Sequence, residues 1–302
     1  MIYTLTLNPA LDYVVRLTDL RMGETNRANT AVLQFGGKGI NVSTILRRLG
    51  ADTTALGFVA GFTGEALAEE LNRRGLPSAF IRLPSGLTRI NVKLGAASTE
   101  TEINAAGPVI PATALEDLRA QLERLTDRDT LVLAGSIPPS LPRDLYGRIA
   151  AELAPKGVRI VVDAEGDALT AVLPHRPFLV KPNRAELESW VGRCLPTQDD
   201  CMAAVKALQQ AGAQNALLSL GREGALLLDE YGAFHRLSAP ALTAVNTVGA
   251  GDSMVAGFLV GLTEGGYEAA LRLGIAAGSA TAASEGLAEE SDIRAWARQI
   301  QD

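Results

Sequence analysis

Asn246-Thr247-Val248-Gly249-Ala250-Gly251-Asp252-Ser253 is the stretch around which the rest of this chain is organised. It follows a short strand-like passage and runs directly into an apolar segment with helical spacing, residues 254–262. Small residues before a helix let backbone amides point at one place, where the positive end of the helix dipole adds to the field. The stretch therefore indicates an anion site at a helix start.

The carboxylate within this stretch, Asp252, changes what the site can do. It is unsuited to a pure phosphate clamp, because like charges repel. It suits a site in which Asp252 accepts a proton from a hydroxyl while backbone amides hold the anionic group being transferred. The alternative is an ordinary glycine-rich helix start with Asp252 as a first-turn residue.

The bulk composition is that of a folded enzyme. The 302 residues suit one large domain or a domain with a small accessory, and 47% hydrophobic residues allow a sizeable core. A formal net charge of −6 argues against nucleic-acid binding, which needs a basic face. Polar residues interrupt the N-terminal apolar run, and no segment approaches the roughly 18 apolar residues of a membrane span. We therefore expect a cytoplasmic protein with no membrane or nucleic-acid partner.

A second glycine loop lies near the start of the chain, in Gly36-Gly37-Lys38-Gly39-Ile40-Asn41. It leads into a helical stripe of apolar residues that is closed by Gly50. A glycine run with an embedded lysine at a helix start suggests a phosphate or sugar oxygen approached by the backbone. The spacing is not that of a Walker loop.

Most of the chain alternates helical and strand-like segments, which predicts parallel strands joined by crossover helices. Ligands of such sheets bind at the carboxyl ends of the strands. That rule places four segments at one rim: residues 135–136, Asp163, residues 181–183 and residues 219–221. A helix-free patch of short strands between residues 81 and 104 interrupts this alternation.

Three smaller patterns have both a functional and a structural interpretation. Asn183 and Glu186, three residues apart, suit a Mg²⁺–water shell or a helix cap. Gly221 and Gly224 could admit a nucleotide against the backbone or only form a turn. Arg89 shares a strand face with two further polar residues and could hold a phosphate, or the face could simply be solvated.

Taken together, these stretches resemble the ribokinase-like PfkB family of carbohydrate kinases, over residues 1 to about 283. Both hallmark regions are present in order, at residues 36–42 and 247–253, with Lys181-Pro182-Asn183 between them. The resemblance implies an α/β fold with a Rossmann-type core, a mainly parallel central sheet and a small β-sheet lid. One kinase domain would span residues 1–302, and the lid would be built from about residues 11–35 and 86–106.

The same resemblance implies four groups of site residues. Asp252 would be the base, and the amides of Gly249, Ala250 and Gly251 would form the anion hole for the γ-phosphoryl group. The phosphorylated sugar would contact Asp12, Gly37, Lys38, Asn41, Arg89, Asn91 and Ser136. ATP would lie against Lys181, Asn183, Ser219, Gly221, Gly224, Thr247 and Ser279. Glu186 would act on Mg²⁺ through water.

Within the family, residues 6–10, 88–94 and 179–184 are most similar to enzymes that use ATP to phosphorylate the 6-hydroxyl of D-fructose 1-phosphate, giving fructose 1,6-bisphosphate. Kinases for tagatose 6-phosphate and fructose 6-phosphate carry similar motifs. The resemblance also implies a homodimer formed through the lid. A monovalent cation would lie near Asn246, Val248 and Ser284. The chain departs from the family pattern at two positions: Asn246 replaces a common aspartate in this cation loop, and elsewhere Ser140 replaces a common glycine after the paired prolines.

Two other classes of protein compete with this interpretation. A nicotinamide-dependent oxidoreductase could use a parallel sheet, but no Gly-x-Gly-x-x-Gly follows the first strand. A non-catalytic sugar-phosphate sensor could use the same scaffold, and the retained Asp252 argues against it.

Overall fold

The computed structural model describes residues 1–96 and 99–300. Residues 97 and 98 of the expected lid segment 86–106 lie outside the described residues. The sequence also predicts a helical run over residues 292–301, and its residue 301 lies outside the described residues as well. The strands are β1 (Ile2–Thr6), β2 (Ala10–Leu17), β3 (Thr30–Gly36), β4 (Thr53–Ala60), β5 (Ile81–Leu83), β6 (Arg89–Ala96), β7 (Thr99–Ile103), β8 (Thr130–Ala134), β9 (Arg159–Asp163), β10 (Leu179–Val180), β11 (Asn215–Ser219), β12 (Ala225–Leu228) and β13 (Phe234–Leu237). The α-helices are α1 (Lys38–Arg48), α2 (Gly61–Arg73), α3 (Ala112–Leu122), α4 (Leu145–Leu153), α5 (Gly166–Val172), α6 (Arg184–Val191), α7 (Gln198–Gln210), α8 (Ala250–Ala282) and α9 (Glu290–Ala297).

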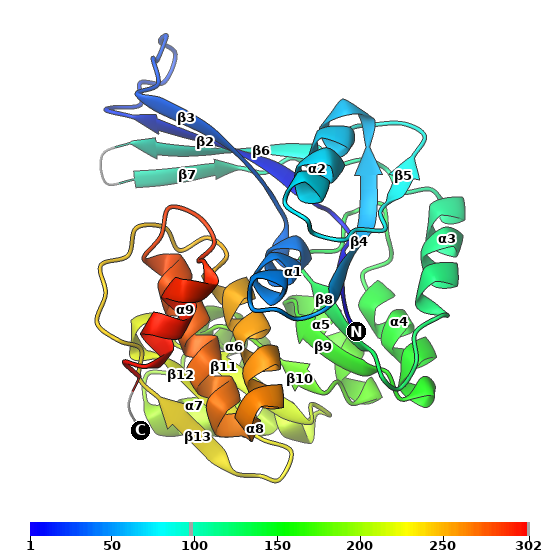
Figure 1. The fold of residues 1–302 in the computed structure, drawn as a ribbon, viewed down its shortest axis with the longest axis vertical. Coiled ribbons are helices and arrows are strands. Elements are labelled where there is room, and N and C mark those ends of the chain that lie inside the picture. The colour runs from blue at the N-terminus through cyan, green and yellow to red at the C-terminus, as the bar shows by residue number, and fades with distance from the viewer. Residues whose placement is uncertain (97–98, 301–302) are drawn as a thin grey trace.

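The strands form two sheets (Figure 1). The central sheet has nine strands in the order β13-β12-β11-β10-β9-β8-β1-β4-β5. Every pair from β11 to β5 is parallel, whereas β11–β12 and β12–β13 are antiparallel. The predicted α/β fold with a mainly parallel sheet is therefore confirmed. The antiparallel β12–β13 hairpin at one edge was not predicted.

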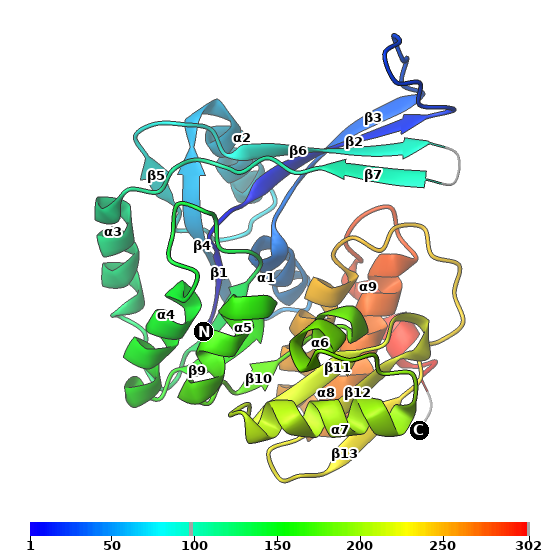
Figure 2. The same cartoon turned by 180° about the vertical axis from the view of Figure 1, so that it is seen from behind.

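The second sheet is small, with four strands in the order β3-β2-β6-β7. It projects to one side of the core, over the region where α1, α8 and α9 lie (Figures 1 and 2). Most of the helix-free patch in the sequence belongs to this sheet, because β6 pairs with β2 and β7 pairs with β6, so neither strand crosses back over the central sheet. The patch begins with β5, which pairs with β4 in the central sheet.

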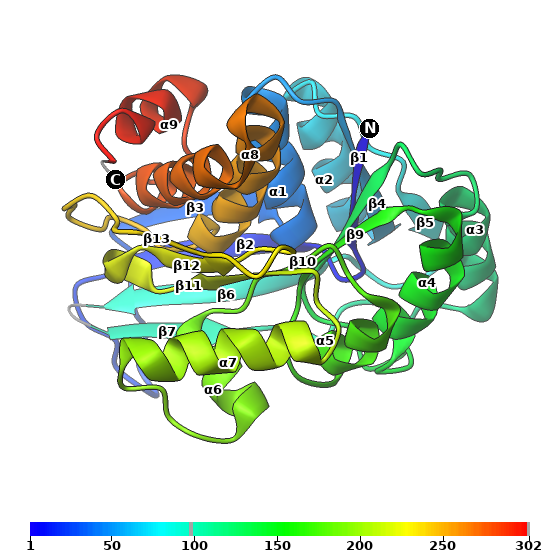
Figure 3. The same ribbon diagram turned by 90° about the horizontal axis from the view of Figure 1, so that it is seen from below.

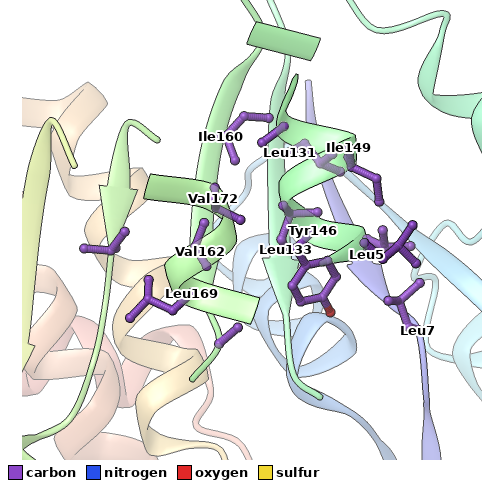
Figure 4. Close-up of a cluster of buried hydrophobic side chains, with 14 of the residues drawn as sticks. Leu5, Leu7, Leu131, Leu133, Tyr146, Ile149, Ile160, Val162, Leu169 and Val172 are labelled. Atoms are coloured by element: carbon purple, nitrogen blue, oxygen red, sulfur yellow. The ribbon is translucent and has the colours of Figure 1, made fainter. Parts of the chain in front are cut away.

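Helices cover both faces of the central sheet (Figure 3). Alternate residues of β8 face opposite sides: Leu131 and Leu133 pack with α3, α4 and α5, whereas Val132 packs with α1 and α8. On the first side, Tyr146 and Ile149 of α4 lie beside the β1 and β8 leucines (Figure 4). A parallel sheet buried on both faces holds its strand ends rigidly, and these ends are where a site can be built.

The helix that follows the glycine-rich stretch is long and interrupted. The sequence predicts separate helical segments over 254–262 and 267–283, and in the structure both belong to α8, which is broken at Gly265 and Gly266. Gly266 has φ 75°, which lies outside helical geometry and favours glycine. Along the described parts of the chain, no helix combines the length and apolarity needed to cross a bilayer.

Candidate active site

A cavity of about 840 Å³ lies where the carboxyl ends of the parallel strands meet the small sheet. It brings together polar residues from segments that are far apart in the sequence. The predicted site residues that line it are Asp12, Gly37, Lys38, Asn41, Arg89, Asn91, Ser136, Lys181, Asn183, Glu186, Ser219, Gly249, Gly251 and Asp252.

The two glycine-rich loops meet directly in this cavity. The side-chain amide of Asn41 donates a hydrogen bond of 2.8 Å from Nδ2 to Oδ2 of Asp252, across 211 positions of sequence. Gly37, with φ 137°, allows α1 to start close to β1, because a Cβ there would lie 2.8 Å from Cγ2 of Thr6. Asp252 is only 5% exposed, in the first turn of α8. The predicted convergence of an acidic side chain and glycine-rich helix starts is therefore present.

A second carboxylate, that of Asp163 at the end of β9, also lines the cavity. Its Oδ1 is 3.2 Å from Nζ of Lys38 and 3.3 Å from Nζ of Lys181. Lys38 is also 4.0 Å from the Glu186 carboxylate. The Lys38 ammonium thus lies among the carboxylates beside Asp252, and not at the small sheet. The sequence rule for parallel sheets placed Asp163 at the rim but assigned it no role.

The charges in this cluster shift the pKa values of its members. Burial, and next the neighbouring Asp163, raise the pKa of Asp252 to about 7, against the opposing effects of Lys38, the Asn41 hydrogen bond and Lys181. Burial also opposes ionisation of Asp163, but Lys181 and Lys38 outweigh it and hold the Asp163 pKa below its usual range. Burial lowers the pKa of Lys38, but the surrounding carboxylates outweigh this and raise it overall. Two buried acids thus differ in proton affinity, which suits Asp252 to exchange a proton near neutral pH.

The small sheet presents a polar face to the cavity. Nδ2 of Asn91 donates to Oδ1 of Asp12 at 2.8 Å, and Nζ of Lys93 lies 3.7 Å from Oδ2 of Asp12 and 3.5 Å from Oε1 of Glu102. Asn91 is 5% and Lys93 7% exposed, so the interpretation as a simply solvated face is wrong for both. Lys93 and Glu102 were not among the predicted site residues, although Lys93 has the same strand periodicity as Asn91 and Arg89.

The Arg89 guanidinium has a hydrogen-bond donor at this face that lacks a partner among the described residues. One terminal nitrogen donates to the Ala105 carbonyl at 3.4 Å, and Nε has no partner among the described residues. Burial lowers the pKa of the Arg89 guanidinium, and the nearby Asp12 opposes that shift. A partly buried cation with open donors is suited to an anionic ligand.

The pair Asn183 and Glu186 forms a helix cap, as the structural interpretation had it. Oδ1 of Asn183 accepts from the Glu186 amide at 2.8 Å, and Oε2 of Glu186 accepts from the Asn183 amide at 2.9 Å. The cap occupies one carboxylate oxygen, and Glu186 still lines the cavity. The cap leaves Oε1, which lies 4.0 Å from Nζ of Lys38.

Five predicted residues do not line the cavity: Ala250, Gly221, Gly224, Thr247 and Ser279. Ala250 is the first residue of α8, between two glycines that do line it. Gly221 begins a short 3₁₀ turn and Gly224 follows it. A Cβ on Gly224 (φ 94°) would lie 2.0 Å from the Leu237 carbonyl oxygen. The close contact between this turn and β13 therefore explains why position 224 is a glycine. Ser279 is buried in α8, and Thr247 is exposed.

The loop expected to hold a monovalent cation is bridged by Asn246 itself. Its Oδ1 accepts from the Val248 amide at 3.0 Å, and its Nδ2 donates to the Glu285 carbonyl at 3.0 Å. The hydroxyl of Ser284 donates to the Ala280 carbonyl. The amide of Asn246 thus ties the glycine-rich stretch to the segment after α8.

Most of the chain is similar to known proteins. Residues 5–294 match the model described as pfkB family carbohydrate kinase. The chain is 43% identical to a 1-phosphofructokinase of Bacillus subtilis, over 97% of this chain and 96% of that protein. It is 35% identical to a D-tagatose-1-phosphate kinase of Bacillus licheniformis, over 100% and 99% of the two chains. The structure of phosphofructokinase-2 from Escherichia coli, in complex with substrates and products, superposes with a TM-score of 0.93 at 31% identity and 99% coverage of both chains.

Proposed function

Because the chain belongs to the pfkB family of carbohydrate kinases, we propose that it transfers the γ-phosphoryl group of ATP to the 6-hydroxyl of D-fructose 1-phosphate. The products are ADP and fructose 1,6-bisphosphate. The membership makes the chain a phosphotransferase with a sugar-phosphate alcohol as acceptor. The observation that carries the assignment to this cavity is the Asn41–Asp252 hydrogen bond, which joins both family motifs at one point.

Asp252 is the base of the proposed reaction. The sugar oxygen attacks the γ-phosphorus, the bond from that phosphorus to the oxygen bridging it to ADP breaks, and the hydroxyl proton passes to Asp252. Phosphoryl transfer needs in-line positioning and neutralisation of spreading charge more than covalent help. A carboxylate with a pKa of about 7 is matched to this proton transfer at neutral pH.

The transferred group is held by the start of α8. The backbone amides of Gly249, Ala250 and Gly251 precede or begin that helix, where donors and helix dipole favour an anion. A Cβ on Gly251 would lie 3.3 Å from Nζ of Lys181, so this ammonium lies beside the same helix start. Lys38, bound to the same carboxylate as Lys181, adds a second positive charge.

The phosphorylated sugar lies toward the small sheet in this proposal. The open donors of Arg89 take its phosphate, since a guanidinium fork matches phosphate oxygens. Asp12, Asn41, Asn91 and Ser136 supply groups that can hydrogen-bond sugar hydroxyls along the path to Asp252. The small sheet then acts as a lid that excludes water, which would otherwise compete for the phosphoryl group.

ATP enters at the opposite end, against Asn183, Ser219 and Val248. The protein ligands there fit Mg²⁺ that arrives with the nucleotide. Glu186 offers one carboxylate oxygen. Among the described residues, no cluster of three acidic, His or Cys side chains could hold a metal ion without further ligands. Mg²⁺ in nucleotide sites takes one or two protein carboxylates, phosphate oxygens and water. Its chemistry is to neutralise phosphate charge. Gly221, Gly224, Thr247 and Ser279 lie outside the cavity lining, and their contact with ATP stays a prediction.

We propose further that a second copy covers the outer face of the lid. Tyr13, Leu33, Ile90 and Ile103 are 42%, 42%, 41% and 57% exposed, and the strand register places Tyr13 opposite Leu33. This apolar face is opposite the polar face that lines the cavity, and an identical face on a second lid would bury it. Leu33→Asp should convert the dimer to a monomer in light scattering. A wild-type monomer at micromolar concentration would contradict the dimer while leaving the reaction untouched.

The reaction is tested by coupled ADP release with fructose 1-phosphate, fructose 6-phosphate, tagatose 6-phosphate and tagatose 1-phosphate. We expect the highest kcat/KM with fructose 1-phosphate. Tagatose 1-phosphate is the main competitor, because a relative that covers the whole chain carries that activity in its name. A higher kcat/KM with any other sugar would reassign the substrate, and release of no ADP with any of them would favour the sensor.

A further inference from the structure

We propose that Asp163 is a positioning residue for phosphoryl transfer: its carboxylate anchors Lys38 and Lys181 as a fixed pair of cations beside Asp252. This inference rests on the proposed function, because it assigns a task within that reaction. Asp163 is 1% exposed and touches the cavity, yet neither the proton transfer nor the binding of either substrate uses it directly.

The anchor is built into the rigid centre of the molecule. Asp163 is the last residue of β9, which has β8 and β10 as parallel neighbours. The Asp163 carbonyl accepts from the Gly135 amide at 3.0 Å, and the Lys181 amide donates to the Val162 carbonyl at 3.0 Å. The carboxylate is therefore held at the rim of the sheet by strand hydrogen bonds on both sides.

The two lysines reach this carboxylate from different directions. Lys38 begins α1, and Lys181 follows β10, yet both ammonium groups approach the same oxygen, Oδ1, at 3.2 and 3.3 Å. Lysine carries a point charge on a flexible stem, so without an anchor its charge is spread over many rotamers. Holding the charges in place before the reaction lets them stabilise the phosphoryl group without reorganisation.

The environment of Oδ2 argues against a purely structural triad. This oxygen is buried without a hydrogen-bond partner among the described residues, whereas a buried ion pair optimised for stability needs its remaining lone pairs satisfied. The lysines also differ in exposure: the side chain of Lys181 is 4% exposed and that of Lys38 39%. The Lys38 ammonium can therefore meet an incoming phosphate while it remains tied to Asp163.

Asp163 has a second, measurable effect on the site. The charged or hydrogen-bonding groups that act on Asp252 are Asp163, Lys38, Lys181 and Asn41. Asp163 opposes ionisation of Asp252, whereas the other three favour it. Removal of the Asp163 charge should therefore slow the reaction, because the cations are no longer fixed, and yet make the base easier to ionise. A residue with only a structural role would not produce this pair of changes.

The test compares Asp163→Asn with Asp167→Asn in kinetics from pH 5 to 9. Asp167 is an exposed carboxylate at the mouth of the same cavity, paired only with Arg143 at 3.4 Å among the described residues, so it controls for loss of a nearby charge. For Asp163→Asn we expect kcat lower by about 10- to 1,000-fold, KM for fructose 1-phosphate within about threefold, and the acid limb of kcat/KM moved to lower pH. Asp167→Asn should keep all three values. Unchanged kcat, or a loss with no movement of the acid limb, would overturn the proposal.

A double-mutant cycle supplies a second readout. Because Asp163 acts through Lys181, Lys181→Met should cost less in the Asp163→Asn background than in the wild type. Equal costs would contradict the anchoring role.

If Asp163→Asn does not fold, the anchor is tested in the wild type by ¹⁵N spectra of the lysine ammonium groups. The signals are assigned with Lys38→Arg and Lys181→Arg. Slow exchange at both sites supports the anchor, and fast exchange at either contradicts it. An inactive wild type would contradict the proposed function instead.

Discussion

The two ends of the cavity are built in different ways. The end around Asp252 and Asp163 is formed by strand ends and helix starts of the core, with Asp252 5% and Asp163 1% exposed. The end around Asp12 and Lys93 lies on a four-stranded sheet whose other face is apolar and partly exposed. The contrast suggests that the rigid core holds the reacting groups, and that the thinner sheet recognises the sugar phosphate. Substitutions at the first end should therefore change kcat, and those at the second should change KM.

The largest effect is expected for Asp252→Asn. The variant keeps the shape of the side chain and its place beside Asn41, but it cannot accept the hydroxyl proton. We expect kcat to fall by about 10²–10⁴-fold, while the Kd for fructose 1-phosphate stays near the wild-type value. Steady-state kinetics and calorimetric titration measure the two quantities. Near-normal kcat would remove Asp252 from the chemistry.

Arg89→Ala should have a smaller effect, confined to the other end. Loss of a charge-assisted contact of about 1.5–3 kcal/mol should raise KM for the sugar phosphate by about 10- to 100-fold, with KM for ATP nearly unchanged. Arg82→Ala is the matched control, because that guanidinium lies 4.0 Å from Glu65 and does not line the cavity. If both variants give the same KM, the substrate phosphate does not bind at Arg89.

The smallest effect is expected in stability and separates folding from catalysis. The folded Asp252 has a pKa of about 7, above its ordinary value of 3.8. Between these two pH values the folded state binds more protons than the unfolded state, so the free energy of unfolding falls as pH rises. Asp252→Asn removes this loss. The Tm of the variant minus that of the wild type should therefore be greater at pH 8 than at pH 4, by on the order of a few degrees. Calorimetry at both pH values measures it, and an equal difference at both would show that the Asp252 pKa is not raised.

Much of the core could be predicted from the sequence, because alternation of buried strands and amphipathic helices is a local pattern. The rule that ligands bind at strand ends placed Asp163, Ser136 and residues 181–183 at one rim, and of these Asp163, Ser136, Lys181 and Asn183 line the cavity. The β12–β13 hairpin was missed, because it is an antiparallel addition to the edge of the sheet.

The details of the site needed three-dimensional structure. No local pattern shows that Asn41 donates to Asp252, or that Lys38 turns toward Asp163, since these contacts span 211 and 125 positions. Glycine alone is ambiguous as well: Gly37 lies in the cavity lining, whereas Gly224 is explained by its approach to the Leu237 carbonyl. Lys93 was passed over because a polar strand face is commonly solvated, and only the pairing of β2, β6 and β7 shows that it is buried.

The most direct test of the account is the pH dependence of kcat/KM for fructose 1-phosphate in the wild-type enzyme. A buried base beside Asp163 must lose its proton before it can accept another, so activity should fall tenfold per pH unit on the acid side, with a midpoint near pH 7. A profile that stays flat down to pH 5 would contradict the assignment of Asp252 as the base.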